Sequence, residues 1–259
     1  MKKILFSDID GTIVKDDQPI SIKDQEAIKK LRNKGHYFSF CTGRNIQETQ
    51  LITPYFEYDY MVLNNGAMIV DQNNQVFYRK QIKNQMAKEI LNTSYQKYPS
   101  LNYTFFDGKQ TYGYINQETC ILTQNGYQSI NQDFFEILNC TTEDIDIVCV
   151  YHPEGNIQEI LEIQQSVNKK YKGIHATLNV VYLDITVDCT KGTGLKKLCE
   201  LLNEDVDSYC IGDSYNDLDM FKKAHHAYTF NHAEQEIKNK TEKQVDFVYE
   251  VVNDMLEGD

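Results

Sequence analysis

The stretch "MKKILFSDIDGT" (residues 1–12) decides the fold that we expect for this chain. Lys3 to Ser7 has the pattern of a short buried strand, and the turn "DGT" ends it. Asp8 and Asp10 follow the apolar run two positions apart. Residues i and i+2 on an extended strand point to the same side, so both carboxylates share one face if the strand continues through Asp10.

Two like charges side by side need a physical reason. Two close carboxylates repel each other by about 1–4 kcal/mol in environments between water and a protein surface. Such a pair persists where a cation neutralises it or where one member stays protonated. A phosphoryl-transfer site needs both, because one aspartate attacks phosphorus beside a metal ion and the other donates a proton. Alone, the pattern is equally compatible with a solvated acidic turn or a fragment of a calcium-binding loop.

Outward from this strand, helical and strand patterns alternate. Ser21 and Asp24 resemble a capping box, and Gly35 stands where a helix C-cap glycine would. The alternation predicts a parallel α/β sheet. The expected helices of this part of the chain are 21–35, 45–52, 191–203 and 216–223, with further helices at the C-terminal end. The expected strands are 37–41, 208–212 and 227–230, and 60–67 is expected to be a strand followed by a loop.

The middle of the chain follows another plan. Arg44 and Lys191 are 147 positions apart, roughly a hundred more than a crossover or two requires. We therefore expect an inserted α+β cap domain over residues 81–187, with 1–80 and 188–259 forming the core. A hairpin that turns at residues 73–74 is expected just before the cap. The expected elements of the cap are helices over 82–97 and 154–171 and strands over 101–106, 111–115, 145–151 and 179–187, whereas 116–143 gives no clear assignment.

Composition limits the function classes. The chain has 259 residues, 41% of them hydrophobic, and a formal charge of −12, which argues against a nucleic-acid or anionic-membrane partner. Only three apolar residues follow "MKK", so we expect no secretion signal, and no stretch approaches the roughly 18 apolar residues of a membrane span. Seven scattered cysteines without a C-x-x-C pair favour reduced thiols, so we expect a cytoplasmic protein.

Three further segments carry residues suited to phosphate chemistry. Thr42 of "TGR" ends a strand, and Lys191 of "TKGTGL" begins a helix, where free amides favour an anion. In "IGDSYNDLDM", Asp213 follows a strand, and Asn216 and Asp217 come one turn later. Each segment alone has an ordinary explanation as a turn, a surface lysine or a helix cap. Together with the acidic pair, in this order, they predict a phosphate site.

These segments resemble the four signature motifs of the haloacid dehalogenase superfamily. They are D-x-D-G-T at 8–12, the hydroxyl motif at Thr42, the lysine motif at Lys191 and G-D-x-x-N-D at 212–217. The segments "CTGR", "NNGA" and "YLDITVDCTKGTGL" resemble its Cof-type branch, which carries a type IIB cap. The resemblance implies a Rossmann-like, doubly wound parallel-sheet core with an inserted α+β cap.

The resemblance also implies catalytic and metal-binding roles. Asp8 would be the nucleophile that forms an aspartyl-phosphate, and its second oxygen would bind Mg²⁺. Asp10 would be the general acid and base, with its backbone carbonyl on the metal. Asp213 would complete the protein ligands, and Asp217 would orient metal-bound water.

Further residues would hold the transferring phosphoryl group. Thr42 and Lys191 would bind it, and Lys191 would also offset the charge on Asp8. Asn216 would support this phosphate shell, and Gly43 would contribute an amide. Gly11 would let the backbone approach the ligand.

The expected function is that of a Mg²⁺-dependent phosphatase acting on a small phosphorylated metabolite, either a sugar phosphate or a phosphorylated cofactor. An acid at Asp10 favours a phosphatase or phosphomutase, because dehalogenases of the superfamily lack it and transport ATPases carry threonine there. A phosphomutase and a phosphate-binding regulatory protein with weak activity stay open as alternatives. We expect no nucleic-acid or membrane partner, and a monomer or weak homodimer.

Two features are left open. The segment "FNHAEQEIK" places Asn231 where the Cof branch has glycine and His232 where it has asparagine. His232 is either an adjunct to catalysis or a helix cap at the surface. Arg44 either binds substrate or braces its loop.

Overall fold

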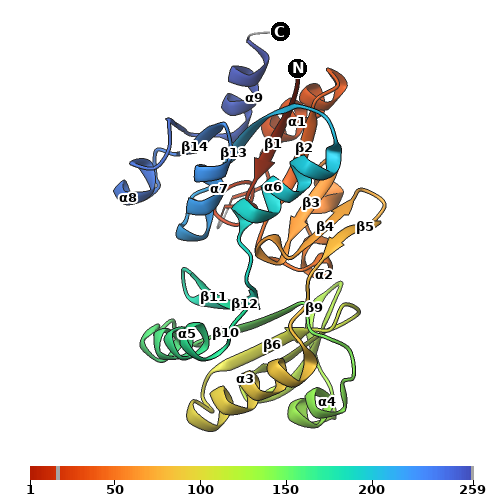
Figure 1. The fold of residues 1–259 in the computed structure, drawn as a ribbon, viewed down its shortest axis with the longest axis vertical. Coiled ribbons are helices and arrows are strands. Elements are labelled where there is room, and N and C mark those ends of the chain that lie inside the picture. The colour runs from red at the N-terminus through yellow and green to blue at the C-terminus, as the bar shows by residue number, and fades with distance from the viewer. Residues whose placement is uncertain (16–17, 258–259) are drawn as a thin grey trace. The chain divides into compact units, whose positions relative to one another are not determined.

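The computed structural model describes residues 1–15 and 18–257, which fold into two compact units (Figure 1). Unit 1 comprises Met1–Arg44, Leu51–Arg79 and Cys189–Asp259, and unit 2 comprises Asn45–Gln50 and Lys80–Asp188. Within the described ranges, every helix is too short or too polar to cross a bilayer.

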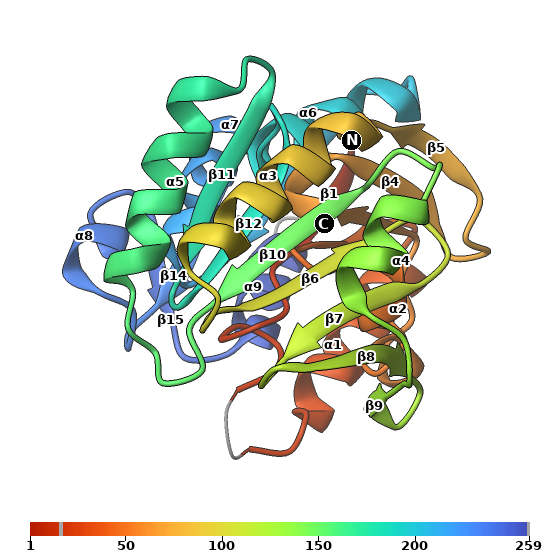
Figure 2. The same cartoon turned by 90° about the horizontal axis from the view of Figure 1, so that it is seen from below.

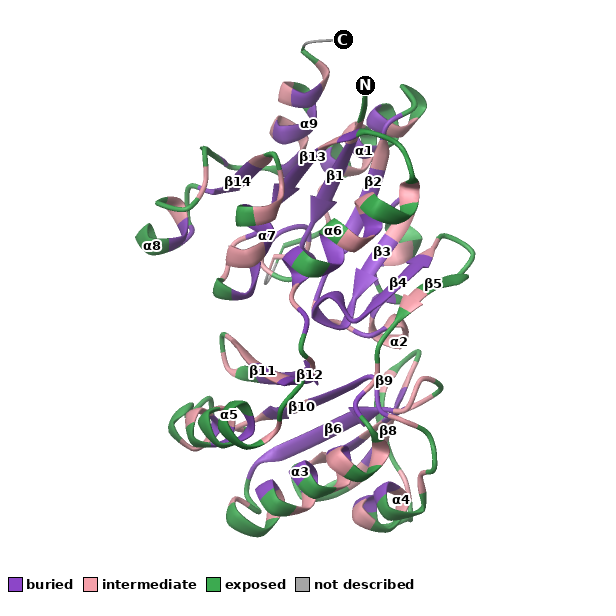
Figure 3. Ribbon diagram, viewed as in Figure 1, coloured by how far each residue is buried: buried purple, intermediate pink, exposed green. Residues whose placement is uncertain are grey.

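Unit 1 is built on one mainly parallel sheet. The predicted strand at Lys3 to Ser7 is confirmed and lies in the middle of this sheet, which Figure 3 shows as mostly buried. The strands Met68–Asp71 and Val76–Arg79, at one edge of the sheet, form the predicted hairpin and are antiparallel to their neighbours. Across the sheet the order is β15 (Lys243–Val245), β14 (His226–Phe230), β13 (Val206–Ile211), β1 (Lys2–Ser7), β2 (Tyr37–Cys41), β3 (Tyr60–Leu63), β4 (Met68–Asp71) and β5 (Val76–Arg79).

Helices cover this sheet. Ile4 and Phe6 pack in one cluster with apolar residues of α6 (Lys191–Leu202) and α7 (Leu218–Lys223). Leu5, which alternates with them, is also fully buried, so both faces of β1 are covered. The remaining helices of unit 1 are α1 (Ile22–Asn33), which contacts α9 (Val248–Leu256), α8 (Gln235–Lys238), and short 3₁₀ turns at Thr53–Tyr55, Asn64–Gly66 and Tyr215–Asp217. The predicted α/β class with a doubly wound parallel sheet is therefore confirmed.

Helix α6 approaches the end of β3 closely through Gly194. A Cβ at this position would lie 2.4 Å from Val62 Cγ1 and 2.6 Å from Gly66 Cα. We expect Gly194→Ala to lower the free energy of unfolding by about 1–3 kcal/mol, although alanine is the better helix former. Glu200→Ala, on the exposed side of the same helix, should change it by less than about 0.5 kcal/mol. Urea denaturation of both variants tests this, and a stabilised Gly194→Ala protein would contradict the close approach.

Unit 2 is an antiparallel sheet with helices on one face, which is an α+β arrangement. Figure 2 shows the longer helices of this unit lying over one face of the strands. The sheet order is β11 (Ile174–Asn179), β12 (Tyr182–Val187), β10 (Ile147–Tyr151), β6 (Asn102–Phe106), β7 (Thr111–Ile115), β8 (Glu118–Thr123) and β9 (Gly126–Ser129), and the helices are α3 (Asn84–Lys97), α4 (Phe134–Cys140) and α5 (Gln158–Lys170). Tyr103 and Phe105 belong to the buried core between the sheet and the helices.

A short segment that follows β2 in sequence belongs to unit 2. It contains α2 (Ile46–Thr49), which is shorter than the predicted helix over 45–52 and is capped by Asn45. The Gln47 side chain accepts from Thr111 N at 2.8 Å and donates to Leu122 O at 2.9 Å. Asn45 Nδ2 donates to Thr111 Oγ1 at 3.2 Å, and both residues are almost fully buried. These bonds attach residues 45–50 to strands β7 and β8.

Candidate active site

Three neighbouring strands deliver polar residues to one edge of the unit 1 sheet. Asp8 follows β1, Thr42 follows β2, and Asp213 comes one residue after the glycine that follows β13. Strand β1 pairs in parallel with both neighbours, and Asp8 N donates to Ile211 O at 3.0 Å. Parallel strands end at the same edge of a sheet, so sequence order and topology together bring these residues to one place.

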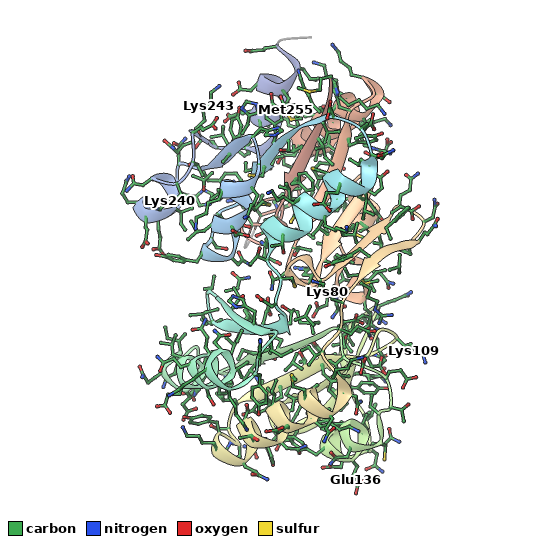
Figure 4. The ribbon with its side chains drawn as sticks, in the orientation of Figure 1. Lys80, Lys109, Glu136, Lys240, Lys243 and Met255 are labelled. Atoms are coloured by element: carbon green, nitrogen blue, oxygen red, sulfur yellow. The ribbon has the colours of Figure 1, made fainter. Side chains whose placement is uncertain are left out.

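Lys191 is the first residue of α6 and is buried, with 1% of its side chain exposed. Its ammonium Nζ lies 2.8 Å from Asp8 Oδ1, 2.7 Å from Asp217 Oδ1 and 3.3 Å from Asn216 Oδ1. By contrast, the labelled Lys240 and Lys243 lie at the surface of unit 1 (Figure 4). Burial lowers the pKa of Lys191, but Asp217 and Asp8 outweigh it and raise the pKa overall. The ammonium therefore stays charged inside the site.

Three carboxylates surround this ammonium. Asp8, Asp213 and Asp217 each offer an oxygen, and these atoms all lie within 4.8 Å of one another. Burial raises the pKa of Asp8 well above its usual value; Lys191 opposes this, whereas Asp217 and Asp213 add to it. One ammonium does not balance three carboxylates, and carboxylate oxygens are the ligands that Mg²⁺ prefers. The residues therefore fit a divalent cation.

Asp217 and Asn216 organise the loop after β13. Asp217 Oδ2 accepts from Asp213 N at 3.0 Å and from Ser214 N at 3.1 Å, so the ordinary capping arrangement is present as well. Asn216 Oδ1 accepts from Ser214 Oγ at 2.7 Å. Its Nδ2 is buried and has no hydrogen-bond partner among the described residues. A buried donor without a partner is costly, which makes this amide available to an anion.

Asp10 stands apart from the three carboxylates. Arg44 clamps it with two hydrogen bonds, Nε to Oδ2 at 2.9 Å and Nη2 to Oδ1 at 2.6 Å. Of the two roles considered for Arg44, bracing the loop is the one that this geometry supports. Thr12, which sequence reasoning did not single out, donates through Oγ1 to Asp213 Oδ1 at 3.0 Å. Its place in the D-x-D-G-T motif was the available signal.

Thr42 and Gly43 lie in the loop between β2 and α2. Thr42 is 1% exposed, its Oγ1 accepts from Arg44 N at 3.2 Å, and its carbonyl accepts from Asn65 N at 3.0 Å. The loop is thus held against the turn that follows β3. This fixes the backbone of residues 42–44 beside Asp10.

His232 is not a helix cap. The N-cap of α8 is Glu234, and the imidazole stacks on Phe230 with ring centroids 4.9 Å apart. His232 is exposed, so its expected position at the surface is confirmed, but its expected role as a cap is wrong because the helix begins two residues further along the chain.

Asp213 should make the stability of the metal-free protein depend on pH. Burial, with a contribution from Asp217, raises the pKa of Asp213 to about 6. The folded state then binds more protons than the unfolded state between about pH 4 and 6, so the free energy of unfolding falls as pH rises through this interval. We expect Asp213→Asn to be more stable than the parent protein by about 1–3 kcal/mol at pH 7.5 in EDTA, with no difference near pH 4.

Chemical denaturation over this pH range tests the prediction, with Asp205→Asn, an exposed aspartate of unit 1, as the matched control. Added Mg²⁺ should stabilise the parent protein and not the variant. A pH-independent difference between parent and variant would contradict the raised pKa.

Comparison with known proteins places the chain in a family of hydrolases. A family model described as haloacid dehalogenase-like hydrolase matches residues 5–252. A protein of Mycoplasma capricolum is 28% identical over 97% of this chain and 99% of its own length. The HMP-PP phosphatase of Klebsiella pneumoniae is 20% identical over 92% of this chain and 87% of its own length.

Solved structures share the fold. A haloacid dehalogenase-like hydrolase from B. subtilis superposes with a TM-score of 0.81 at 19% identity, covering 98% of this chain and 99% of that one. A sugar phosphatase of haloacid dehalogenase subclass IIB gives a TM-score of 0.76 at 18% identity, covering the same shares of the two chains. At these identities the likeness shows the fold alone.

Proposed function

Since the chain belongs to the family of haloacid dehalogenase-like hydrolases, we propose that it is a Mg²⁺-dependent phosphatase acting on a small phosphorylated metabolite through an aspartyl-phosphate. A phosphatase is the enzyme class that the family and its named relatives support. Relatives named for a sugar phosphate and for HMP-PP favour a sugar phosphate or a phosphorylated cofactor as substrate.

The observation that carries this proposal is the buried ammonium of Lys191, 2.8 Å from Asp8 Oδ1 and beside two more carboxylates. Phosphate-ester hydrolysis is extremely slow without a catalyst, and the site must supply positive charge around the phosphoryl oxygens. Lys191 and the unpartnered amide of Asn216 offer that charge and hydrogen bonding within a chain that is acidic overall. Thr42 and the backbone of Gly43 complete the phosphate cradle.

The reaction proceeds in two steps. Asp8 attacks phosphorus, so that a bond forms from its carboxylate oxygen while the bond to the leaving oxygen breaks and Asp10 gives that oxygen a proton. Water then loses a proton to Asp10 and attacks phosphorus, and the bond to Asp8 breaks to release inorganic phosphate. Both steps need Asp10 to be placed within reach of the departing or entering oxygen.

Mg²⁺ would be held by Asp8, Asp213 and the backbone carbonyl of Asp10, with Asp217 orienting its water. When bound, it supplies charge that screens the carboxylates and polarises a phosphate oxygen. The pKa values of Asp8 and Asp213 are raised, so their charged forms are unfavourable in the metal-free site. A bound cation would therefore stabilise the site.

Turnover of p-nitrophenyl phosphate by the purified protein tests this function. We expect Mg²⁺-dependent activity that falls by at least about 100-fold in EDTA and returns on adding Mg²⁺. A panel of sugar phosphates and phosphorylated cofactors, scored by kcat/KM from phosphate release, then identifies the substrate class. Phosphate release only with a bisphosphate activator would favour a phosphomutase, and no turnover on the panel would favour a regulatory phosphate-binding protein.

A further inference from the structure

The turn that follows β3 consists of three residues with left-handed backbones. Asn64, Asn65 and Gly66 have φ values of 52°, 51° and 98°, and they belong to the segment "NNGA", to which the proposed function gives no role. Residues with a Cβ rarely adopt a positive φ, although asparagine tolerates it better than most. Two successive asparagines in this conformation therefore call for an explanation.

The side chain of Asn64 does not supply this explanation. Asn64 is fully buried, and its Oδ1 and Nδ2 have no hydrogen-bond partner among residues 1–15 and 18–257. A buried carboxamide without partners is unfavourable, so no contact with the described residues accounts for asparagine here. What asparagine contributes at this position is tolerance of the left-handed backbone.

The left-handed turn changes the hydrogen bonding between β2 and β3. These strands are parallel, and Thr42 N donates to Val62 O at 2.9 Å. In a regular parallel ladder the carbonyl of Thr42 would next accept from the amide of Asn64. Instead it accepts from Asn65 N at 3.0 Å, and Asn64 N donates to Arg44 O at 3.1 Å. Two successive amides thus bond to the same loop, whereas in an extended strand successive amides point to opposite sides.

These two bonds hold the loop after β2 at both of its polar residues. The Thr42 hydroxyl, which belongs to the proposed phosphate cradle, accepts from Arg44 N at 3.2 Å. The Arg44 side chain in turn donates to both carboxylate oxygens of Asp10. One turn therefore fixes the backbone of the phosphate-binding threonine and the backbone from which the clamp on Asp10 extends.

The turn is itself fixed against the start of α6. A Cβ on Gly66 would lie 2.1 Å from the carbonyl oxygen of Thr190, the N-cap of the helix that begins with Lys191. Cys189 Sγ lies 4.0 Å from Asn64 O. The turn therefore lies between the loop after β2 and the helix terminus that carries the buried ammonium.

We propose that Asn64 and Asn65 are positioning residues, whose left-handed backbones fix the loop of Thr42 in its phosphate-binding place. Through Arg44 the same turn holds the carboxylate of Asp10. This inference rests on the proposed phosphatase function. A residue that disfavours a positive φ lets the turn relax toward the regular ladder, in which the Arg44 carbonyl loses its amide partner and the loop shifts.

Substitutions that differ mainly in their tolerance of a positive φ test the proposal. Asn64→Gly and Asn64→Ala both remove the carboxamide, but glycine accepts a φ of 52° readily and alanine does not. We expect kcat/KM for p-nitrophenyl phosphate to stay within about threefold of the parent value in Asn64→Gly and to fall about fivefold or more in Asn64→Ala. Asn64→Val, which is β-branched, should lose about 30-fold or more.

Two further measurements distinguish positioning from a general loss of stability. The inhibition constant of inorganic phosphate reports the cradle around Thr42, and it should rise in Asn64→Ala and Asn64→Val but not in Asn64→Gly. The loss of kcat should be larger with phenyl phosphate than with p-nitrophenyl phosphate, because a displaced Arg44 no longer holds the general acid, which matters most for poor leaving groups.

The chain offers a matched control in Asn74. This residue has φ 61° and is exposed in the turn between β4 and β5 of the same unit. Asn74→Gly, Asn74→Ala and Asn74→Val repeat the series of backbone strain away from the site. They should change the free energy of unfolding in the order of that strain and leave kcat/KM and phosphate inhibition within about twofold of the parent values.

Equal losses in Asn64→Gly and Asn64→Ala would overturn the inference, because the carboxamide and not the backbone would then be needed. This comparison decides the matter even where Asn64→Val folds poorly. Undiminished turnover in Asn64→Ala would overturn the inference as well, and in both cases the phosphatase function would stand. A parent protein that hydrolyses none of the aryl phosphates would instead overturn the proposed function, so the two failures are distinguishable in one set of assays.

Discussion

Asp8→Asn is expected to abolish turnover while raising the stability of the metal-free protein. The proposed nucleophile is lost, and we expect kcat to fall by at least about 10⁴-fold. Stability should rise at neutral pH because burial, together with the neighbouring carboxylates, makes a charged Asp8 unfavourable without a cation. Lys191 keeps Asp217 as a partner at 2.7 Å, so the ammonium is not left unpaired.

Opposite changes in activity and stability cannot come from misfolding. Acid-quenched reactions with ³²P-labelled substrate should trap an acyl-phosphate on the parent protein and none on Asp8→Asn. Asp205→Asn, an exposed aspartate in the same unit, serves as the control and should behave like the parent protein. More than about 1% residual activity in Asp8→Asn would exclude Asp8 as the nucleophile.

Lys191→Met should lower both the free energy of unfolding and the turnover. It removes the ammonium that lies between Asp8 and Asp217, whose side chains are 4% and 0% exposed. Removing one partner of a buried ion pair costs about 3–5 kcal/mol, because the other charge stays buried and unpaired. We expect the loss of stability to shrink as pH falls, since the raised pKa of Asp8 lets this carboxyl take up a proton early.

The matched control stands on the same helix. Lys197 is 38% exposed and pairs with Glu200 at 3.1 Å, so Lys197→Met should cost no more than about 1 kcal/mol. Urea denaturation of both variants measures the difference. Adding Asp217→Asn to Lys191→Met should recover part of the stability and none of the turnover. Similar costs for the two lysine substitutions would contradict the central role of the buried ammonium.

Much of the core fold could be predicted because its signals are local. Strand β2 (Tyr37–Cys41) lies where the sequence indicated, and α6 begins at Lys191 as expected. In unit 2, the predicted strand over 179–187 is in fact the end of β11 and all of β12, joined at Val180 with φ 53°. A β-branched residue rarely adopts this conformation, so the turn was invisible in the sequence.

The same cause hid β8, whereas Asn125-Gly126 stands where β9 begins, with Gly126 at φ 94°, a turn signal that the sequence contained and that was missed. The turn before β8 places Asn116 at φ 51° and Gln117 at φ 65°, without the glycine that usually marks such a turn. Residues 116–143 therefore gave no clear assignment.

The sequence identified those candidate site residues that belong to a local motif. It did not reveal contacts between residues from distant segments of the chain. Asp8, Lys191 and Asp213 were singled out from strand ends and a helix start. The clamp of Arg44 on Asp10 depends on the pairing of β1 with β2, which a local pattern does not contain.

The membership of residues 45–50 in unit 2 bears on any attempt to exchange domains. The chain passes between the two units at four peptide bonds, after Arg44, Gln50, Arg79 and Asp188. A chimaera that replaced only residues 80–188 would set Asn45, which donates to the Thr111 hydroxyl, against the side chains of another protein. A graft between homologues therefore has to transplant the hexapeptide together with the larger piece, and recombination at a single pair of junctions would yield a mismatched hybrid.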